Sequence, residues 1–213
     1  MRRRAAATVF GCASVLLDYP DERNLADLRS VRGALEGVPD KNARSGLAVA
    51  VEWLEHMSPI EAQAIYVETF DLRKGVCLHL THYRHGDTRE RGMALTALVD
   101  AFRGAGFGVA SGELPDYLPA LLELAAVHPV GATVLAEHRM ALDALRAALS
   151  RTDARYAGVV DAMLCALPGP TARDRQALRR YRSEGPPSEK VGLEPFAPPE
   201  VLGQAGATAE ARR

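Results

Sequence analysis

The stretch SPIEAQAIYVETF, from Ser58 to Phe70, shows how this chain folds. Its first four residues form the signature of a capping box. Ser58 can accept a hydrogen bond from the backbone of Glu61, Glu61 can reach back to the backbone of Ser58, and Pro59 fits the first turn of a helix. The residues that then share one face at helical spacing are Ala62, Ile65, Tyr66, Thr69 and Phe70. The stretch therefore predicts a helix that begins after Ser58 and buries one side.

The same helical period recurs along most of the chain. Apolar positions three or four residues apart predict helices around residues 9–17, 25–35, 47–54, 95–102, 118–125, 135–149 and 156–167. A second capping box, DTRE from Asp87 to Glu90, predicts the start of the helix that contains residues 95–102. Only CLHLT, residues 77–81, alternates as a strand does. We predict an all-α, single-domain bundle of roughly eight to ten helices without a sheet.

The composition changes near residue 183. The segment RDRQALRRYR, residues 173–182, is basic and predicts a surface helix, whereas the residues after it are rich in Pro, Gly, Ala and Glu and keep no period. Such a composition cannot bury enough apolar surface to fold. We therefore predict a helical domain over residues 1–182 and a disordered tail over residues 183–213.

Charge and cysteine content exclude several classes of protein. The 213 residues carry a formal net charge of -1, so no overall field attracts nucleic acid or an anionic membrane. The three cysteines, Cys12, Cys77 and Cys165, are odd in number and far apart, which argues against a disulfide framework or a thiolate metal site and fits a reducing cytoplasm. No window reaches the ~18 apolar residues of a membrane span.

The N-terminal sequence MRRRAAATVFGCAS resembles a secretory leader. The apolar run before Cys12 is short for a leader, however, and the apolar pattern continues through Val15, Leu16 and Leu17. We interpret this segment as the first helix of the core.

The stretch HYRHGDTRERG, from His82 to Gly92, raises the question of a metal site. His79, His82 and His85 are three residues apart, but on a helix the first and third of them drift off a common face. The spacing matches neither HxxxH nor HExxH. A small metal-dependent hydrolase built on these three histidines is the alternative that we keep open.

Other common catalytic signatures do not occur in the sequence. There is no GxSxG, no P-loop and no GxGxxG. The segment ELPDYLP, from Glu113 to Pro119, has a proline near each end and predicts a rigid loop that leads into a helix. Such a loop can hold Tyr117 and Leu118 over a groove between helices, or it can be only a connection.

Several of these motifs together resemble the NarJ family. The resemblance rests on YVETFD (Tyr66–Asp71), LHL (Leu78–Leu80), HGDTRERG (His85–Gly92), ELPDYLP and LELAA (Leu122–Ala126), in matching order and spacing over Val9 to Leu167. NarJ proteins are assembly chaperones of respiratory nitrate reductase and belong with the wider TorD/DmsD group of molybdoenzyme chaperones. The resemblance thus implies a TorD-like helical fold. His82 and Arg84 have no match that we can carry over.

The resemblance also implies a function. A chaperone of this kind is cytoplasmic, catalyses no reaction and needs no cofactor of its own. It binds the N-terminal peptide of the catalytic (alpha) subunit, keeps that subunit competent for insertion of the molybdenum cofactor, and delays membrane docking. Proteins that deliver the cofactor are a further implied partner, and a chaperone for another molybdoenzyme is the nearest alternative. An apolar groove on a helical bundle can bind such a peptide through helical anchors.

The motifs indicate which residues contact the peptide. Those expected to form an apolar wall are Tyr66, Phe70, Leu80, Leu118 and Leu122. The acids expected to meet basic residues of the peptide are Asp71, Asp87, Glu113 and Asp116. The remaining expected contacts are His79, His85, Arg89 and Tyr117. Each apolar residue in this set could equally belong to the core.

Overall fold

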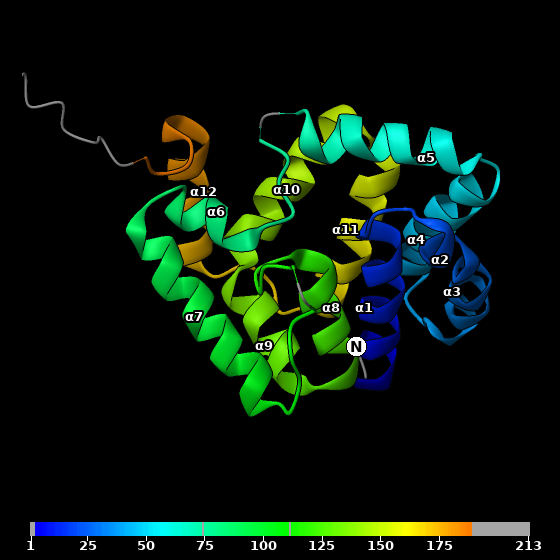
Figure 1. Ribbon diagram of the computed structural model, residues 1–213, viewed down its shortest axis with the longest axis horizontal. Coiled ribbons are helices and arrows are strands. Elements are labelled where there is room, and N and C mark those ends of the chain that lie inside the picture. The colour runs from blue at the N-terminus through cyan, green and yellow to red at the C-terminus, as the bar shows by residue number, and fades with distance from the viewer. Residues whose placement is uncertain (1–2, 74, 111, 189–213) are drawn as a thin grey trace, which may run out of the picture.

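The computed structural model describes residues 3–73, 75–110 and 112–188, and within these ranges the regular elements are all helices (Figure 1). In chain order they are α1 (Arg3–Leu17), α2 (Glu22–Ala26), α3 (Leu28–Ala34), the 3-10 turn η1 (Leu35–Gly37), α4 (Lys41–Glu55), α5 (Pro59–Tyr66), the π-helical turn η2 (Val67–Asp71), α6 (Leu80–His85), α7 (Arg89–Gly104), α8 (Leu118–Val127), α9 (Pro129–Glu137), α10 (Arg139–Thr152), α11 (Ala154–Ala166) and α12 (Ala172–Glu184). The all-α prediction is confirmed. No helix in the described ranges is long and apolar enough to cross a membrane.

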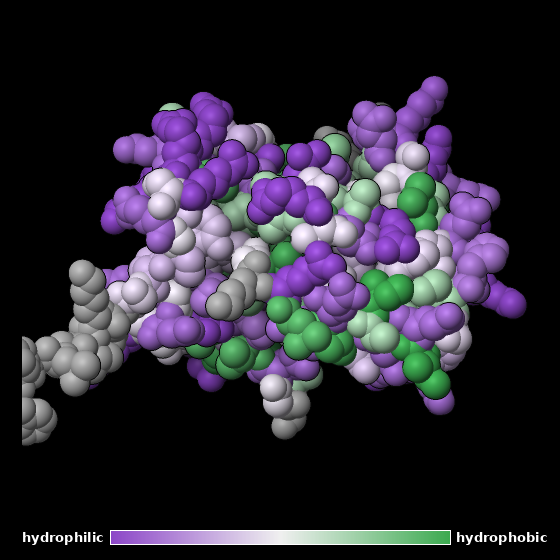
Figure 2. Space-filling model, turned by 90° about the horizontal axis from the view of Figure 1, so that it is seen from above, coloured by the Kyte–Doolittle hydropathy of each residue, from purple (hydrophilic) through white to green (hydrophobic). Residues whose placement is uncertain are grey.

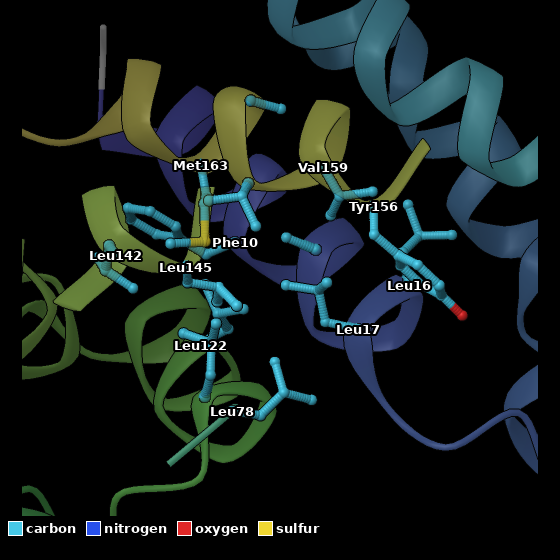
Figure 3. Packing of buried hydrophobic residues seen from close by; sticks show 14 of the residues in the cluster. Phe10, Leu16, Leu17, Leu78, Leu122, Leu142, Leu145, Tyr156, Val159 and Met163 are labelled. Carbon is cyan, nitrogen blue, oxygen red and sulfur yellow. The ribbon is translucent and has the colours of Figure 1, made fainter. Parts of the chain in front are cut away.

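Helix α1 lies at the centre of the bundle. It packs along α8 and α11, and α4 packs across α11 (Figure 1). The side chains between these helices form one continuous core that includes Phe10, Leu16, Leu17, Leu78, Leu122, Leu142, Leu145, Tyr156, Val159 and Met163 (Figure 3). The apolar face predicted around Val9–Leu16 is thus the hub of the fold, as its complete burial shows.

The crossing of α4 and α11 depends on a glycine pair. A Cβ added to Gly46 would lie 2.5 Å from the carbonyl oxygen of Gly158, which is closer than any real Cβ comes. The absence of a side chain at both positions therefore lets the two helix backbones touch.

The capping box at Ser58 is confirmed. The backbone N–H of Ser58 donates to the Glu61 carboxylate at 3.0 Å, and the N–H of Glu61 donates to the Ser58 hydroxyl at 3.3 Å. Beyond Tyr66 the helix widens into η2, so that Thr69 and Phe70 still point inward.

The capping box predicted at DTRE is wrong. Helix α7 is preceded by Thr88, and no side chain caps its first turn. Asp87 instead lies 3.5 Å from Arg91, and Glu90 lies 3.5 Å from His85. The Asp87 carboxylate thus lies beside the Arg91 guanidinium and the Glu90 carboxylate beside the His85 ring, and neither caps the first turn of α7.

Two predicted helices are divided. The pattern over residues 135–149 predicts one helix, but α9 ends at Glu137 and α10 begins at Arg139. Between them His138 adopts φ -95° and ψ 19°, and its ring Nδ1 lies 2.9 Å from the carbonyl oxygen of Val134. The pattern over residues 25–35 is likewise broken at Asp27, between α2 and α3.

The basic segment near the C-terminus forms α12, which has no buried residue and confirms the predicted surface helix. Most of the predicted tail, residues 189–213, lies outside the described residues. Figure 2 shows one face of the molecule, on which hydrophilic side chains predominate and hydrophobic ones form separate patches.

Candidate functional site

Asp116 of the ELPDYLP loop lies at the centre of a buried polar cluster. Its side chain is fully buried, and its Oδ1 accepts a hydrogen bond from Nδ1 of His79 at 3.0 Å. Its Oδ2 accepts from the backbone N–H of Thr81 at 3.3 Å and from the Thr81 hydroxyl. Arg91 lies 3.5 Å from the same oxygen and also donates from Nε to the Thr81 hydroxyl at 3.2 Å. One carboxylate thus joins residues of the LHL, HGDTRERG and ELPDYLP motifs.

These contacts keep Asp116 ionised. Burial by itself would raise the pKa of its carboxyl, but the hydrogen bonds from His79 and Thr81 and the charges of His79 and Arg91 outweigh that effect. The pKa is therefore lowered below its ordinary value. Asp116 is therefore charged at neutral pH. We call this carboxylate, together with His79, Thr81 and Arg91, the Asp116 clamp.

The backbone reinforces this clamp. The N–H of Leu118 donates to the carbonyl of Leu78 at 2.8 Å, and the N–H of Leu80 donates to the carbonyl of Asp116 at 3.0 Å. These bonds form an isolated antiparallel bridge between His79 and Tyr117. The strand-like alternation of CLHLT reflects this single bridge and the start of α6 at Leu80.

A chain of hydroxyl groups extends from the cluster to Asp18, the residue that follows α1. Tyr117 donates its hydroxyl to Asp18 at 2.9 Å, and its oxygen lies 3.0 Å from the hydroxyl of Tyr66. Burial is the main cause that raises the pKa of both tyrosines, so both remain protonated at neutral pH. The ELPDYLP loop is thus tied to Asp18, directly after α1, and to α5, as well as to α6 and α7.

The residues expected to form an apolar wall lie in the core. Leu80, Leu118 and Leu122 are completely buried, and Tyr66 and Phe70 are less than a tenth exposed. Phe70 packs between the rings of Tyr66 and Tyr156, at centroid distances of 4.7 and 4.8 Å. These side chains shape the site from beneath, and in this conformation a peptide could not touch most of their surface.

The other predicted contacts divide into two groups. The structure brings His79, Asp116 and Tyr117 together, and the His79 and Tyr117 rings lie 5.5 Å apart. Asp71, Asp87, Arg89 and Glu113 are exposed, and His85 is half-buried at the end of α6. That any of them contacts a peptide stays a prediction.

The three histidines of the alternative metal site point to different carboxylates. His79 pairs with Asp116, His82 lies 3.8 Å from Asp87, and His85 lies 3.5 Å from Glu90. Among the described residues, no group of three His, Cys, Asp or Glu side chains could hold a metal ion.

The ELPDYLP loop borders a groove between α1, α8 and the segment that joins α7 to α8, and the predicted contacts Glu113 and Tyr117 line it, whereas its other lining residues were not predicted. It consists of two adjoining hollows, which we call the acidic hollow and the apolar hollow and together the α1/α8 groove. The acidic hollow, of about 420 Å³, is lined by residues that include Asp18, Asp21, Asp27, Glu113 and Glu123. The apolar hollow, of about 390 Å³, is lined by residues that include Phe102, Phe107, Val109, Leu124 and Val127.

The two hollows share Ser14, Ala110, Ala120 and Glu123, so they form one continuous surface. A signal for it was present in the sequence. LELAA places Glu123 among apolar residues of α8, on the one face that the core leaves open.

Comparison with known proteins identifies the family. The model of the family described as nitrate reductase delta subunit matches residues 39–161. A Bacillus subtilis (strain 168) protein named "Probable nitrate reductase molybdenum cofactor assembly chaperone NarJ" is 32% identical over 160 residues, which cover 74% of this chain and 87% of that relative. The chain belongs to the nitrate reductase delta subunit family. The resemblance to NarJ is thereby confirmed.

Other members of the family differ in length. The Escherichia coli (strain K12) nitrate reductase molybdenum cofactor assembly chaperone NarJ is 33% identical over 156 residues, which cover 71% of this chain and 66% of that protein. The nitrate reductase-like protein NarX of Mycobacterium tuberculosis (strain ATCC 25618 / H37Rv) is 38% identical over 157 residues. The match covers 73% of this chain but only 24% of NarX, so the chain spans about a quarter of that relative.

The fold also matches a solved structure. A protein from Archaeoglobus fulgidus described as a redox enzyme maturation protein superposes with a TM-score of 0.54 at 18% identity, over 75% of this chain and 90% of that one. The TorD-like fold implied by the sequence is in keeping with this match.

Proposed function

We propose that this protein is a chaperone dedicated to respiratory nitrate reductase. It acts in the cytoplasm, where it binds the N-terminal segment of the catalytic alpha subunit. It keeps that subunit competent to receive the molybdenum cofactor and delays its docking to the membrane. The observation that carries this proposal is the membership of the nitrate reductase delta subunit family, in which the Bacillus and Escherichia relatives are named as assembly chaperones.

The chemistry of the clamp supports binding over catalysis. A general base works best when its pKa lies near the operating pH. The pKa of Asp116 is instead lowered, and both of its oxygens are occupied by His79, Thr81 and Arg91. An anion held in this way positions a loop and does not exchange protons with a substrate.

The geometry of the ELPDYLP loop also suits a protein that binds a partner on its surface. Three helices, α5, α6 and α7, and Asp18 directly after α1 hold the ELPDYLP loop through side-chain contacts. A loop fixed from several sides can offer the same groove to successive clients without first being ordered, which lowers the cost of binding.

Loss of the gene in a nitrate-respiring host tests the proposal. The host should still make the alpha subunit, but the membrane-bound enzyme should contain little molybdenum. Metal analysis of the purified enzyme measures this directly. Normal molybdenum content and normal membrane attachment in the deletion strain would exclude the proposal.

The client is identified by affinity purification of the chaperone from the same cells. We expect the nitrate reductase alpha subunit to be the protein recovered, and removal of its N-terminal segment should abolish recovery. Recovery of a different molybdoenzyme would assign the chaperone to that enzyme instead.

A further inference from the structure

Helix α12 carries an excess of positive charge. Its 13 residues include five arginines and two acids. Both acids are occupied, since Asp174 completes the capping box with Thr171 and Glu184 pairs with Arg180 at 2.8 Å. Within residues 3–73, 75–110 and 112–188, no ion pair within 4.0 Å involves the other arginines of the helix, namely Arg173, Arg175, Arg179 and Arg182.

Three of these arginines share the outer side of the helix. Leu178 and Tyr181 pack against the core and fix the inner side of α12. Arg175, Arg179 and Arg182 follow one another at i, i+4 and i+7, so they lie on one face of the helix, and all three are exposed. The packing of α12 on the bundle thus turns them toward solvent.

Helix α10 adds a fourth arginine to this face. The two helices pack against each other at one end of the molecule (Figure 1). Arg151, in the last turn of α10, is exposed and lines a hollow of about 470 Å³ together with Arg182 and Gly75. Its Nη1 donates to the carbonyl of Ala147 in its own helix at 2.9 Å, and no described carboxylate forms an ion pair with it. We call Arg151, Arg175, Arg179 and Arg182 the arginine face.

A large apolar side chain is exposed in the turn beside the arginine face. Leu72 is 74% exposed and stands three residues before Gly75, which lines the hollow between α10 and α12. Arg73 and Glu68 in the same turn pair with each other at 2.6 Å, so the exposed acid nearest to Leu72 in the sequence is Asp71. Cations beside an exposed apolar residue are the combination by which proteins adsorb to a lipid surface.

We propose that the arginine face is a docking surface for a membrane that contains anionic phospholipids, and that Leu72 enters the interface beside it. The net charge of -1 does not oppose this, because charges more than ~8–10 Å apart are largely screened at physiological salt, and the lipid meets mainly the face turned toward it. Each arginine near such a surface strengthens binding roughly fivefold, so the four together give a reversible attachment.

The chemistry of the face favours lipid over nucleic acid. A basic surface that binds single-stranded nucleic acid also offers aromatic rings on which the bases stack. The aromatic residue of α12, Tyr181, instead lies against the ring of Tyr83, at a centroid distance of 5.4 Å. The inference does not rest on the proposed function, because binding to lipid requires no client.

Sedimentation of the full chain with sucrose-loaded vesicles tests the inference. Vesicles of phosphatidylglycerol and phosphatidylcholine should carry the protein down at low ionic strength and release it at high salt, whereas vesicles of phosphatidylcholine alone should not bind it. Arg179→Gln and Arg182→Gln should each weaken binding about fivefold. The matched control is Arg29→Gln, an exposed arginine on α3 at the far side of the molecule from α12 (Figure 1), which should bind as the wild type does.

Two further variants test the turn beside the arginine face. Leu72→Ser should weaken binding to the anionic vesicles about threefold or more through lost apolar contact, and Asp71→Asn should strengthen binding because it removes an opposing charge. The control for the apolar contact is Val127→Ser, which alters a residue that is 63% exposed at the end of α8 and should leave binding unchanged.

A charge-preserving variant separates adsorption to lipid from a fitted protein contact. The double variant Arg179→Lys/Arg182→Lys should bind the anionic vesicles within about twofold of the wild type, because a lipid surface responds to charge and not to the planar guanidinium. Retained binding by this variant, against its loss in the glutamine variants, also excludes damage to the fold as the cause.

Three outcomes would overturn the inference and leave the proposed function standing. The first is no sedimentation with phosphatidylglycerol vesicles at low ionic strength. The second is a lysine variant that loses as much binding as the glutamine variants, which would indicate a partner that reads the guanidinium geometry. The third is tighter binding to a single-stranded RNA oligonucleotide than to the vesicles at the same salt concentration.

Discussion

Replacement of Asp116 by asparagine tests the central role that the structure gives to this carboxylate. The substitution keeps the size of the side chain but removes its charge and turns one acceptor oxygen into a donor. His79, Thr81 and Arg91 all address the carboxylate, so the new amide must face at least one of their donor groups. The variant therefore loses at least one charge-assisted hydrogen bond and leaves the Arg91 charge without its buried partner.

The magnitude follows from burial. Removing one partner of a fully buried ion pair costs about 3–5 kcal/mol. Here Asp116 is fully buried, but the side chains of His79 and Arg91 remain 33% and 21% exposed, so water screens part of the interaction. We expect Asp116→Asn to lower the free energy of unfolding by roughly 2–4 kcal/mol, a large part of the ~5–15 kcal/mol of a typical domain.

The effect should depend on pH in a defined direction. Because the pKa of Asp116 is lower in the folded chain than its ordinary value of 3.8, the ionised carboxylate stabilises the fold fully above that value. This contribution disappears as the pH falls below 3.8 and through the lowered pKa. The difference in stability between wild type and Asp116→Asn should therefore be larger at neutral pH than in acid.

Urea denaturation followed by circular dichroism measures both quantities. The matched control is Asp87→Asn, which removes a carboxylate that lies at the same 3.5 Å from Arg91 but is 84% exposed. It should change the stability by less than ~0.5 kcal/mol. A variant at Asp116 as stable as this control would refute the assignment of a buried clamp.

Three further outcomes test other parts of the fold. Gly46→Ala should destabilise the protein by about 1–2 kcal/mol in thermal unfolding, because the close approach of α4 and α11 leaves no room for a Cβ. The control Gly92→Ala, in open space on α7, should stabilise the protein slightly. Tyr117→Phe should cost about 1–1.5 kcal/mol in urea, since it removes the hydroxyl that links two neighbours, and an unchanged midpoint would show that the link contributes nothing. In thiol labelling of the native protein at neutral pH, the exposed Cys165 should react before Cys12, whose burial raises its pKa to about 11, and Cys12 should react only on unfolding.

The local pattern of the sequence predicts where the helices lie, but it does not predict where all of them begin and end. Ser58 and Glu61 form the capping box that their spacing predicts, because no stronger partner competes for either side chain. Asp87 and Glu90 have the same spacing, but their carboxylates lie 3.5 Å from Arg91 and His85 and do not cap the helix. The spacing of a capping box takes account only of hydrogen bonds to the backbone. It therefore does not predict contacts with neighbouring side chains.

The candidate site was likewise predicted only in part. The motifs indicated that His79, Asp116 and Tyr117 matter, and the fold brings these three residues together. Their exact partners depend on tertiary contacts between residues about forty positions apart, which no local period encodes. Only part of the α1/α8 groove was predicted, for a related reason. Of its acids Glu113 was expected, but Asp18, Asp21 and Asp27 lie between helices near the N-terminus and Glu123 lies on α8, so no single stretch of the sequence contains them all.

The buried carboxylate of Asp116 has a consequence for how such chains diverge. Because this one carboxylate satisfies donors from His79, Thr81 and Arg91, a change at Asp116 alone leaves those donors without their partner and lowers stability. We expect these four positions to be exchanged as a set or not at all in homologous sequences. Glu113 and Glu123, which line the groove and form no ion pair in the described part of the chain, carry no such constraint and can change one at a time.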